Sequence, residues 1–389
     1  MRVMDVRVAE APLYAEIANA VIDFSKMTVS IVAVVTDAVV DGEPVVGYGF
    51  NSNGRYAQTG LLTERLLPRL EAADADELLD HETGVIDPVA VRRVVMRNEK
   101  PGGHGDRAVA VGTLDMAMWD AAAKALGRPL HRVLNDRFRP DMPPAESVWV
   151  YAAGGYYRPG DDLGGLRDEI QGYLDLGYRD VKIKIGGAPL AADLERIEAV
   201  IDMLPDGSRL AVDANGRFDV RTAMEYAAAL EAYDLLWYEE PCDPLDYRGH
   251  AVLAEEYPGV LATGENLFSV QDVGNLVRYG GLRADRDVLQ MDPCLSYGVS
   301  EYVAMLDRLD FHGWAPQRCC PHGGHQYNLA VAAAFQLGGC ESYPMVFQPY
   351  GGFADETPVR DGRVALSEAP GVGIEHKAAL HALFRDRCG

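Results

Sequence analysis

Residues 180–185 read DVKIKI, one of eight short apolar runs of the same kind. The other seven recur along the second part of the chain: VWVYAA (148–153), RLAVDA (209–214), LLWYEE (235–240), VLATGE (260–265), DVLQMD (287–292), FHGWAP (311–316) and CESYPM (340–345). Helical stretches separate these runs. Strands that alternate with helices form parallel sheets, and eight such units predict a closed (β/α)8 barrel.

The residues before these runs follow a different pattern. Residues 28–50 are rich in β-branched side chains and predict antiparallel strands joined by a turn at Asp41-Gly42. Residues 107–126 predict an alanine-rich helix, and strands followed by helices are typical of an α+β domain. We therefore predict three parts in the 389 residues: an α+β capping domain over 1–140, the barrel over 141–345, and a C-terminal segment over 346–389 that returns to the capping domain.

Composition limits the classes of partner. The net charge of −23 repels phosphate backbones and anionic membranes, so we expect neither nucleic acid nor a membrane as a partner. Six cysteines without a Cys-x-x-Cys pair predict free, buried thiols in a reducing compartment. The first residues, MRVMDVRVAEAPLY, lack the apolar run of a signal peptide, and we find no apolar run long enough to span a membrane. We expect a cytoplasmic protein.

Ionisable residues stand at the ends of the predicted strands from the second strand onward. Enzymes with a (β/α)8 barrel place their active site at this end of the strands. Charges left without a partner in an apolar barrel mouth would be costly, so we predict that these residues form the active site. They are Lys182, Lys184, Asp213, Glu239, Glu265, Asp292, His322 and Glu341.

Three of these carboxylates predict a metal site. Asp213, Glu239 and Glu265 lie on three successive predicted strands, 26 residues apart at each step. Carboxylate oxygens with open water positions suit Mg²⁺, whereas zinc sites favour His and Cys ligands, of which none converge here. We therefore predict magnesium as the cofactor.

The remaining strand-end residues predict two proton-transfer groups. Lys182 and Lys184 share one face of a strand, and two neighbouring ammonium groups lower each other's pKa, which would make Lys184 a base. Asp292 is expected to orient His322 as the second acid/base, while His325 is more typical of a structural histidine. Glu341, if burial keeps it protonated, would donate a hydrogen bond to an enolate oxygen.

Two segments carry a family resemblance. Residues 110–134 (AVGTLDMAMWDAAAKALGRPLHRVL) and the spacing of Asp213, Asn215 and Glu239-Glu240-Pro241 resemble the signatures of the enolase superfamily, mandelate racemase subgroup. The resemblance covers essentially the whole chain. It implies magnesium ligands at Asp213, Glu239 and Glu265, and acid/base roles for Lys184 and His322. Lactonising cycloisomerases and dipeptide epimerases of the subgroup carry a lysine where Asp292 stands, which argues against those activities.

The resemblance also implies a reaction. Within the subgroup the sequence looks most like the enzymes that dehydrate D-tartrate, a hydroxy-dicarboxylate, to oxaloacetate and water through an enediolate, which makes the protein a hydro-lyase. Lys184 would remove the α-proton and His322 would assist loss of the β-hydroxyl. Dehydration of another acid sugar (galactarate, glucarate or an aldonate) and racemisation of a 2-hydroxy acid remain open, as does a binding protein on the same scaffold. We also expect a homo-oligomer.

Substrate specificity is expected on loops of the capping domain, at residues 19–27 and 49–56. A diacid needs cations or amide donors for its distal carboxylate. The predicted substrate-binding residues are Asn215, Asn51, Asn53, Arg55 and Lys100, with His104 as a further candidate.

Overall fold

A computed structural model describes residues 1–158, 160 and 163–389. The N-terminal residues form an antiparallel sheet of three strands in the order β1-β2-β3: β1 (Val3–Pro12), β2 (Thr28–Val40) and β3 (Glu43–Phe50). The predicted turn between β2 and β3 is confirmed, since Asp41 and Gly42 both have positive φ angles, of 53° and 87°. Such turns match the twist of the strands they join. The edge strand β1 was not predicted.

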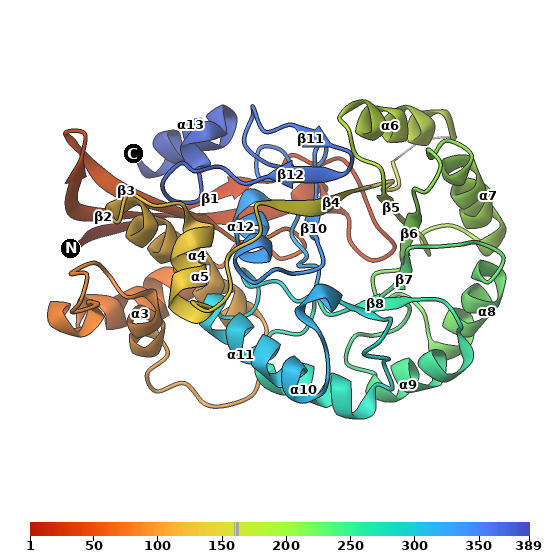
Figure 1. The fold of residues 1–389 in the computed structure, drawn as a ribbon, viewed down its shortest axis with the longest axis horizontal. Helices are drawn as coiled ribbons and strands as arrows, with labels where there is room; N and C mark the ends of the chain where they lie inside the picture. Colours follow the sequence, from red (N-terminus) through yellow and green to blue (C-terminus); the bar gives the residue numbers. More distant parts are fainter. Residues whose placement is uncertain (159, 161–162) are drawn as a thin grey trace.

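Helix α4 (Asp106–Ala125) packs on one face of this sheet and is the longest helix of the N-terminal part (Figure 1). The other helices of this part are η1 (Phe24–Lys26), α1 (Thr59–Leu61), η2 (Leu62–Leu66), α2 (Leu67–Glu71), η3 (Ala75–Leu78), α3 (Pro88–Val95) and α5 (Leu130–Phe138). Helix α4 lies directly on β3. A Cβ atom at Gly47 would come within 2.1 Å of Ala117 O, and one at Gly49 within 2.4 Å of Thr113 O. The two glycines therefore allow this close approach.

The barrel strands run parallel: β4 to β9 are each hydrogen-bonded to the next, and β10 pairs with β4. They are β4 (Ser147–Gly154), β5 (Val181–Lys184), β6 (Leu210–Asp213), β7 (Trp237–Glu239), β8 (Leu261–Thr263), β9 (Val288–Leu289) and β10 (Cys340–Ser342). The helices between them form the outer layer in Figure 1: α6 (Leu163–Asp175), α7 (Leu190–Ile201), α8 (Val220–Leu230), α9 (Tyr247–Glu256), α10 (Val270–Tyr279), α11 (Val299–Phe311) and α12 (Gln326–Ala334). The predicted barrel fold is confirmed.

The predicted seventh strand, residues 311–316, is wrong. Helix α11 runs through Phe311, and the chain then turns at Gly313, which has a φ of 81°. The seventh barrel position is taken further along, after η4 (Pro316–Arg318), where Cys320 N donates to Leu289 O at 2.9 Å and His322 N donates to Gln290 O at 3.3 Å. The aromatic residues of FHGWAP belong to a helix end and the turn after it.

The C-terminal segment lies against both parts of the molecule. It contains β11 (Val359–Arg360), β12 (Arg363–Ala365), η5 (Ile374–His376) and α13 (Ala378–Cys388). Strand β12 pairs with β4 of the barrel, whereas α13 packs on β1 and β2 (Figure 1). The ring of Phe384 lies 4.8 Å from that of Tyr48, and Arg7 Nη1 donates to Cys388 O at 3.0 Å. The two chain ends therefore meet on one sheet.

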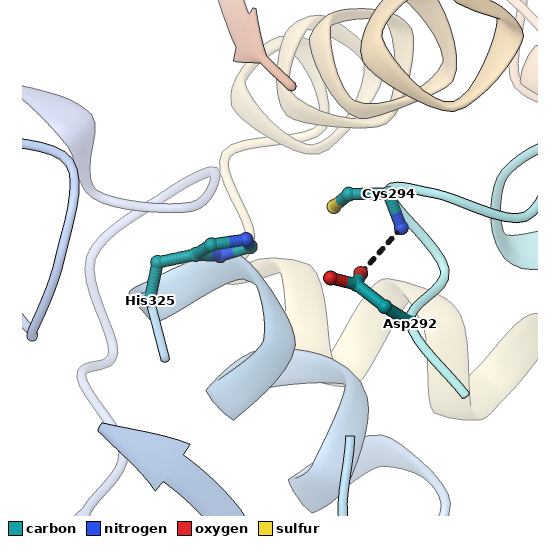
Figure 2. A group of neighbouring side chains, drawn as sticks. All are labelled: Asp292, Cys294 and His325. Atoms are coloured by element: carbon teal, nitrogen blue, oxygen red, sulfur yellow. Dashed lines mark hydrogen bonds between the residues drawn. The ribbon is translucent and has the colours of Figure 1, made fainter. Parts of the chain in front are cut away.

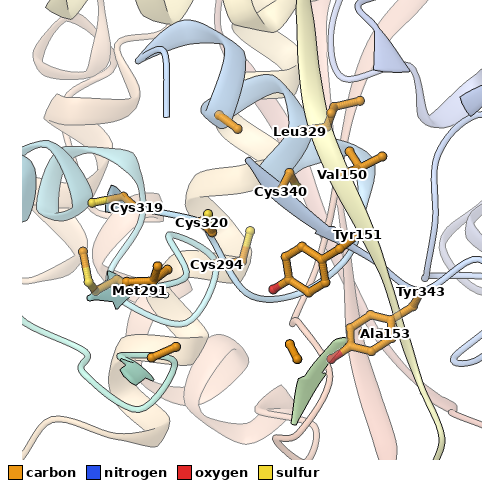
Figure 3. Packing of buried hydrophobic residues seen from close by; sticks show 14 of the residues in the cluster. Val150, Tyr151, Ala153, Met291, Cys294, Cys319, Cys320, Leu329, Cys340 and Tyr343 are labelled. Carbon is orange, nitrogen blue, oxygen red and sulfur yellow. The ribbon is translucent and has the colours of Figure 1, made fainter. Parts of the chain in front are cut away.

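The barrel interior is densely packed with apolar side chains (Figure 3). All six cysteines are free and buried, and Figure 3 labels four of them, Cys294, Cys319, Cys320 and Cys340, within this apolar cluster. Burial raises the pKa of the Cys320 thiol to about 12, so it remains protonated. Among the described residues, we find no helix with the length and apolarity needed to cross a membrane.

Candidate active site

A cavity of about 280 Å³ lies at the carboxyl ends of the barrel strands, where loops of the capping domain cover them. Asn19, Ile22 and Phe24 of the 19–27 loop line it, as do Asn53 and Arg55 of the loop after β3. The barrel side contributes Tyr156, Lys184, Asn215, Glu240, Glu265, Asn266, His322 and Tyr343. Residues from two distant parts of the chain therefore share one cavity.

Three carboxylates converge beside this cavity, and one of them, Glu265, lines it. Asp213 ends β6, Glu239 ends β7 and Glu265 follows β8, and their oxygens can all lie within 4.8 Å of one another. Asp213 and Glu239 are buried, whereas Glu265 is partly exposed and lines the cavity. A hard cation with oxygen ligands at 2.0–2.1 Å suits such a set. Asn215 Oδ1, buried beside Asp213, has no hydrogen-bond partner, which leaves one further oxygen at the site.

The electrostatics also favour a cation at this point. Burial and the neighbouring Asp213 raise the pKa of Glu239 to about 7. Burial and Glu265 likewise raise the pKa of Glu240. Carboxylates that crowd together in this way repel one another, and a divalent ion among them would offset that repulsion.

The two lysines occupy different environments. Lys184 lines the cavity and its Nζ lies 2.5 Å from Asp213 Oδ2. Lys182 is 1% exposed and lies beneath, with its Nζ 2.6 Å from Glu239 Oε1 and 2.7 Å from Glu341 Oε1. The predicted lowering of the Lys184 pKa is wrong for the metal-free protein. Burial opposes the charge, but the attraction of Asp213 outweighs it and holds the pKa above its usual value.

His322 and Asp292 form the predicted pair. His322 Nδ1 lies 3.1 Å from Asp292 Oδ2, and His322 Nε2 faces the cavity 3.7 Å from Glu265 Oε2. Burial opposes protonation of His322, but Glu265 and Asp292 outweigh it and raise the pKa of the imidazole to about 9. The imidazole is therefore a cation near neutral pH, in a position to give up a proton.

A second group of metal-type side chains lies behind this pair. Figure 2 shows Asp292, Cys294 and His325, whose ligand atoms lie within 4.8 Å of one another. Hydrogen bonds engage some of these atoms, since Asp292 Oδ1 accepts from Cys294 N at 2.8 Å and His325 Nε2 lies 2.7 Å from Ser52 Oγ. Burial lowers the pKa of His325 to about 4. Burial also raises the pKa of the Cys294 thiol, so Cys294 and His325 are neutral neighbours of the Asp292–His322 pair.

Glu341 lies beside Lys182 rather than in an apolar setting. Gly323 N donates to its Oε2 at 3.0 Å. Burial would raise the pKa of Glu341, but the ammonium groups of Lys182 and Lys184 and the His322 cation hold it below its usual value. The prediction of a protonated Glu341 is therefore wrong for the metal-free protein.

Two predicted substrate-binding residues lie outside the cavity. Asn51 is buried and serves its own loop: its Oδ1 accepts from Ser30 N at 2.6 Å and its Nδ2 donates to Arg55 O at 2.9 Å. Lys100 is exposed on the 98–106 loop, near His104, which pairs with Tyr297. Loop polarity alone does not indicate which way a loop faces, so these predictions are corrected. Asn53, Arg55 and Asn215 do line the cavity.

Several lining residues were missed. Tyr156 and Tyr343 follow β4 and β10, and Asn266 follows Glu265. Asn266 joins the capping domain to the barrel, because it accepts a hydrogen bond from Arg55 and its Nδ2 donates to Glu240 Oε1 at 2.7 Å. Their position one to three residues beyond a strand end was the available signal.

The fold and the carboxylate cluster define a (β/α)8 barrel enzyme with an α+β cap. Residues 165–380, more than half of the chain, match the family described as Enolase C-terminal domain-like. The chain belongs to this family.

Characterised relatives span most of the chain. It is 28% identical over 345 residues to the L-talarate/galactarate dehydratase of Salmonella typhimurium, which covers 88% of this chain and 80% of that protein. It is 26% identical over 349 residues to the arabinonate dehydratase of Saccharolobus solfataricus, with 87% of each chain covered. The structure of the Salmonella typhimurium enzyme liganded with Mg and L-lyxarohydroxamate superposes with a TM-score of 0.75 at 25% identity, covering 95% of this chain and 88% of that one.

Proposed function

We propose that the protein is a magnesium-dependent hydro-lyase that dehydrates a hydroxy-dicarboxylate, with D-tartrate as the favoured substrate. The observation that carries the proposal is that Lys184 and His322 reach one cavity from the second and seventh barrel positions, beside three convergent carboxylates. The dehydratase relatives, one of them solved with Mg, support the reaction class and the cofactor.

The chain's own residues supply both proton transfers. A Mg²⁺ ion held by Asp213, Glu239 and Glu265 would offset the charge that develops on the substrate carboxylate and draw part of the Asp213 charge away from Lys184. Lys184, once neutral, takes the α-proton. His322, protonated at the start, gives its proton to the β-hydroxyl, which leaves as water. From tartrate, the resulting enol rearranges to oxaloacetate.

The capping loops fit a second carboxylate. Arg55 lines the cavity, and its guanidinium lies 5.2 Å from the ring centre of Phe268, which restricts its position. Asn53 adds an amide on the same loop. The net charge of −23 repels an anionic substrate. The Arg55 guanidinium supplies a local positive charge that would offset this repulsion.

The test is a substrate panel. The protein is incubated with MgCl2 and each tartrate isomer, galactarate, glucarate or arabinonate, and 2-keto acid is detected with semicarbazide. We expect keto acid from D-tartrate above the others. Keto acid from a larger acid sugar alone would favour the second candidate, an acid-sugar dehydratase like the relatives. Loss of optical rotation without keto acid would mean a racemase and would contradict dehydration.

A further inference from the structure

Three buried donors form hydrogen bonds with the Glu239 carboxylate. Lys182 Nζ lies 2.6 Å from its Oε1. Its Oε2 accepts two neutral hydrogen bonds, from Trp237 Nε1 at 2.8 Å and from Gln290 Nε2 at 2.8 Å. Neither Trp237 nor Gln290 lines the cavity, so these contacts act on the carboxylate from its buried side.

The two neutral donors form a layer beneath the carboxylate cluster. Trp237 precedes Glu239 by two residues on β7, so both side chains point into the barrel. Gln290 follows β9 and precedes Asp292 by two residues. Trp237 is 2% exposed and Gln290 is 1% exposed. The ring of Tyr151, 5.0 Å from that of Trp237, completes this layer.

Placing two polar groups this deep in a barrel has a cost that their partner must offset. A buried N–H without an acceptor destabilises the fold, and a hydrogen bond to a charged group offsets that cost. Both donors meet the same oxygen of one carboxylate, which restricts rotation of that carboxylate about its Cγ–Cδ bond. A packed apolar layer would fill the same space but leave the Glu239 carboxylate held from its buried side by Lys182 alone.

We propose that Trp237 and Gln290 are positioning residues for Glu239, which fix the orientation of its carboxylate and thereby set the affinity of the site for Mg²⁺. The inference rests on the proposed metal site. Groups that orient a metal ligand typically change metal affinity by about 10–100-fold when they are removed.

Calorimetric titration with MgCl2 tests Gln290. Gln290→Met keeps the size of the side chain and removes the N–H donor. The matched control is Gln326→Met, because Gln326 is also buried, at 6% exposed, but donates to Val372 O at 3.4 Å, away from the cluster. We expect the Kd for Mg²⁺ to rise about 10–100-fold in Gln290→Met and to stay within about twofold in Gln326→Met.

Each outcome has one meaning. Equal affinity of Gln290→Met and the wild type would overturn the inference while leaving the metal site intact. An equal loss in both variants would indicate a general packing effect and would also overturn it. If the wild-type protein does not bind Mg²⁺, the proposed metal site fails, and the inference fails with it.

Tryptophan fluorescence tests Trp237 independently. Because its indole donates directly to Glu239, Mg²⁺ binding should change its emission. Trp237→Phe keeps a ring against Tyr151 and should lose this response. Trp149→Phe is the control, since Trp149 lies 6.4 Å from Trp237 and donates instead to Asp180 Oδ2 at 2.9 Å. If the fluorescence response is lost in Trp149→Phe and retained in Trp237→Phe, the assignment is overturned.

Discussion

At the scale of single residues, the chemistry depends on how Lys184 is surrounded. Its ammonium lies 2.5 Å from Asp213 and 5.0 Å from the ring centre of Tyr156. Both neighbours favour the charged form, and they outweigh burial. The base of the proposed reaction is therefore a cation in the metal-free protein and becomes available only when the charge of Asp213 is engaged elsewhere.

Lys184→Ala should remove turnover while the fold remains. Without the amine no group of the cavity is placed to take the α-proton, so we expect keto-acid formation to fall by at least about 10²–10⁴-fold, the usual contribution of a positioned acid/base. Steady-state assays with D-tartrate and Mg²⁺, with circular dichroism as the fold control, provide the measurement. Activity within tenfold of the wild type would contradict the role of Lys184 as the base.

The identities of the site residues were predictable from the sequence because barrel strands end at one rim. Lys184, Asp213 and Glu239 are each the last residue of a buried strand, so the topology alone brings them together. Their pKa shifts were not predictable. The direction depends on whether Lys184 faces Lys182 or Asp213, and a strand pattern does not contain that distance.

At the scale of elements, the first backbone N–H of helix α11 is capped by a carboxylate of another helix. Val299 N donates to Asp115 Oδ2 of α4 at 2.9 Å, which links the capping domain to the barrel. Asp115 is buried, and burial raises its pKa from 3.8 to about 7.

This raised pKa gives a pH dependence of stability. Between about pH 4 and 7 the unfolded chain releases the Asp115 proton while the folded protein keeps it, so folding binds a proton and stability falls as the pH rises. The slope from this group is at most about 1.4 kcal/mol per pH unit. Asp115→Asn keeps an oxygen that can accept from Val299 N but has no carboxyl group that titrates. Urea unfolding at pH 5 and pH 7 should therefore show a smaller decline in the variant. An unchanged decline would mean that another group titrates.

The contact between α4 and β3 should not tolerate a methyl group. In Gly49→Ala the new Cβ would meet Thr113 O at 2.4 Å, which is backbone and cannot move aside. Overpacking of this kind costs about 1–3 kcal/mol. Gly60→Ala is the control, because no atom lies within 4 Å of its Cβ position. Thermal unfolding should show a loss for Gly49→Ala and little change for Gly60→Ala, whereas equal melting temperatures would contradict the close packing.

Seven of the eight predicted runs are strands near their predicted places, and the misplaced run 311–316 and the unpredicted strand β1 show where the sequence pattern fails. The segment at the seventh barrel position, Cys319–His322, contains a proline and has little apolar periodicity. The run FHGWAP therefore fitted a strand pattern better. Strand β1 has many exposed residues, as an edge strand does, and the alternation of Val6 and Val8 with Asp5 and Arg7 was not used as a strand signal.

At the scale of the whole molecule, the cavity exists only because the cap and the barrel fold together. Arg55 and Ile22 come from the first part of the chain, whereas Glu265 and His322 come from the barrel. The orientation of the cap loops decides which polar residues face the substrate. This arrangement is why Asn51 and Lys100 could not be separated from Asn53 and Arg55 by sequence.

Metal binding should stabilise the whole protein. At a Mg²⁺ concentration of about 100 times the Kd, ligand binding adds about 2.7 kcal/mol to the free energy of unfolding. We expect the melting temperature to rise with MgCl2, and this rise to be lost after EDTA and in Glu265→Gln. Glu255→Gln, which removes an exposed carboxylate on α9, should retain it. A rise of equal size in Glu265→Gln would place the ion elsewhere.

Deuterium exchange in the variant His322→Asn tests the proposed division of labour most directly. The variant keeps Lys184 and lacks the acid that helps the hydroxyl leave. In D2O with MgCl2 and D-tartrate, proton NMR should show loss of the α-proton signal while keto acid forms at least about 10²-fold more slowly than in the wild type. Keto acid at the wild-type rate, or no exchange in the variant when Lys184→Ala still exchanges, would contradict it.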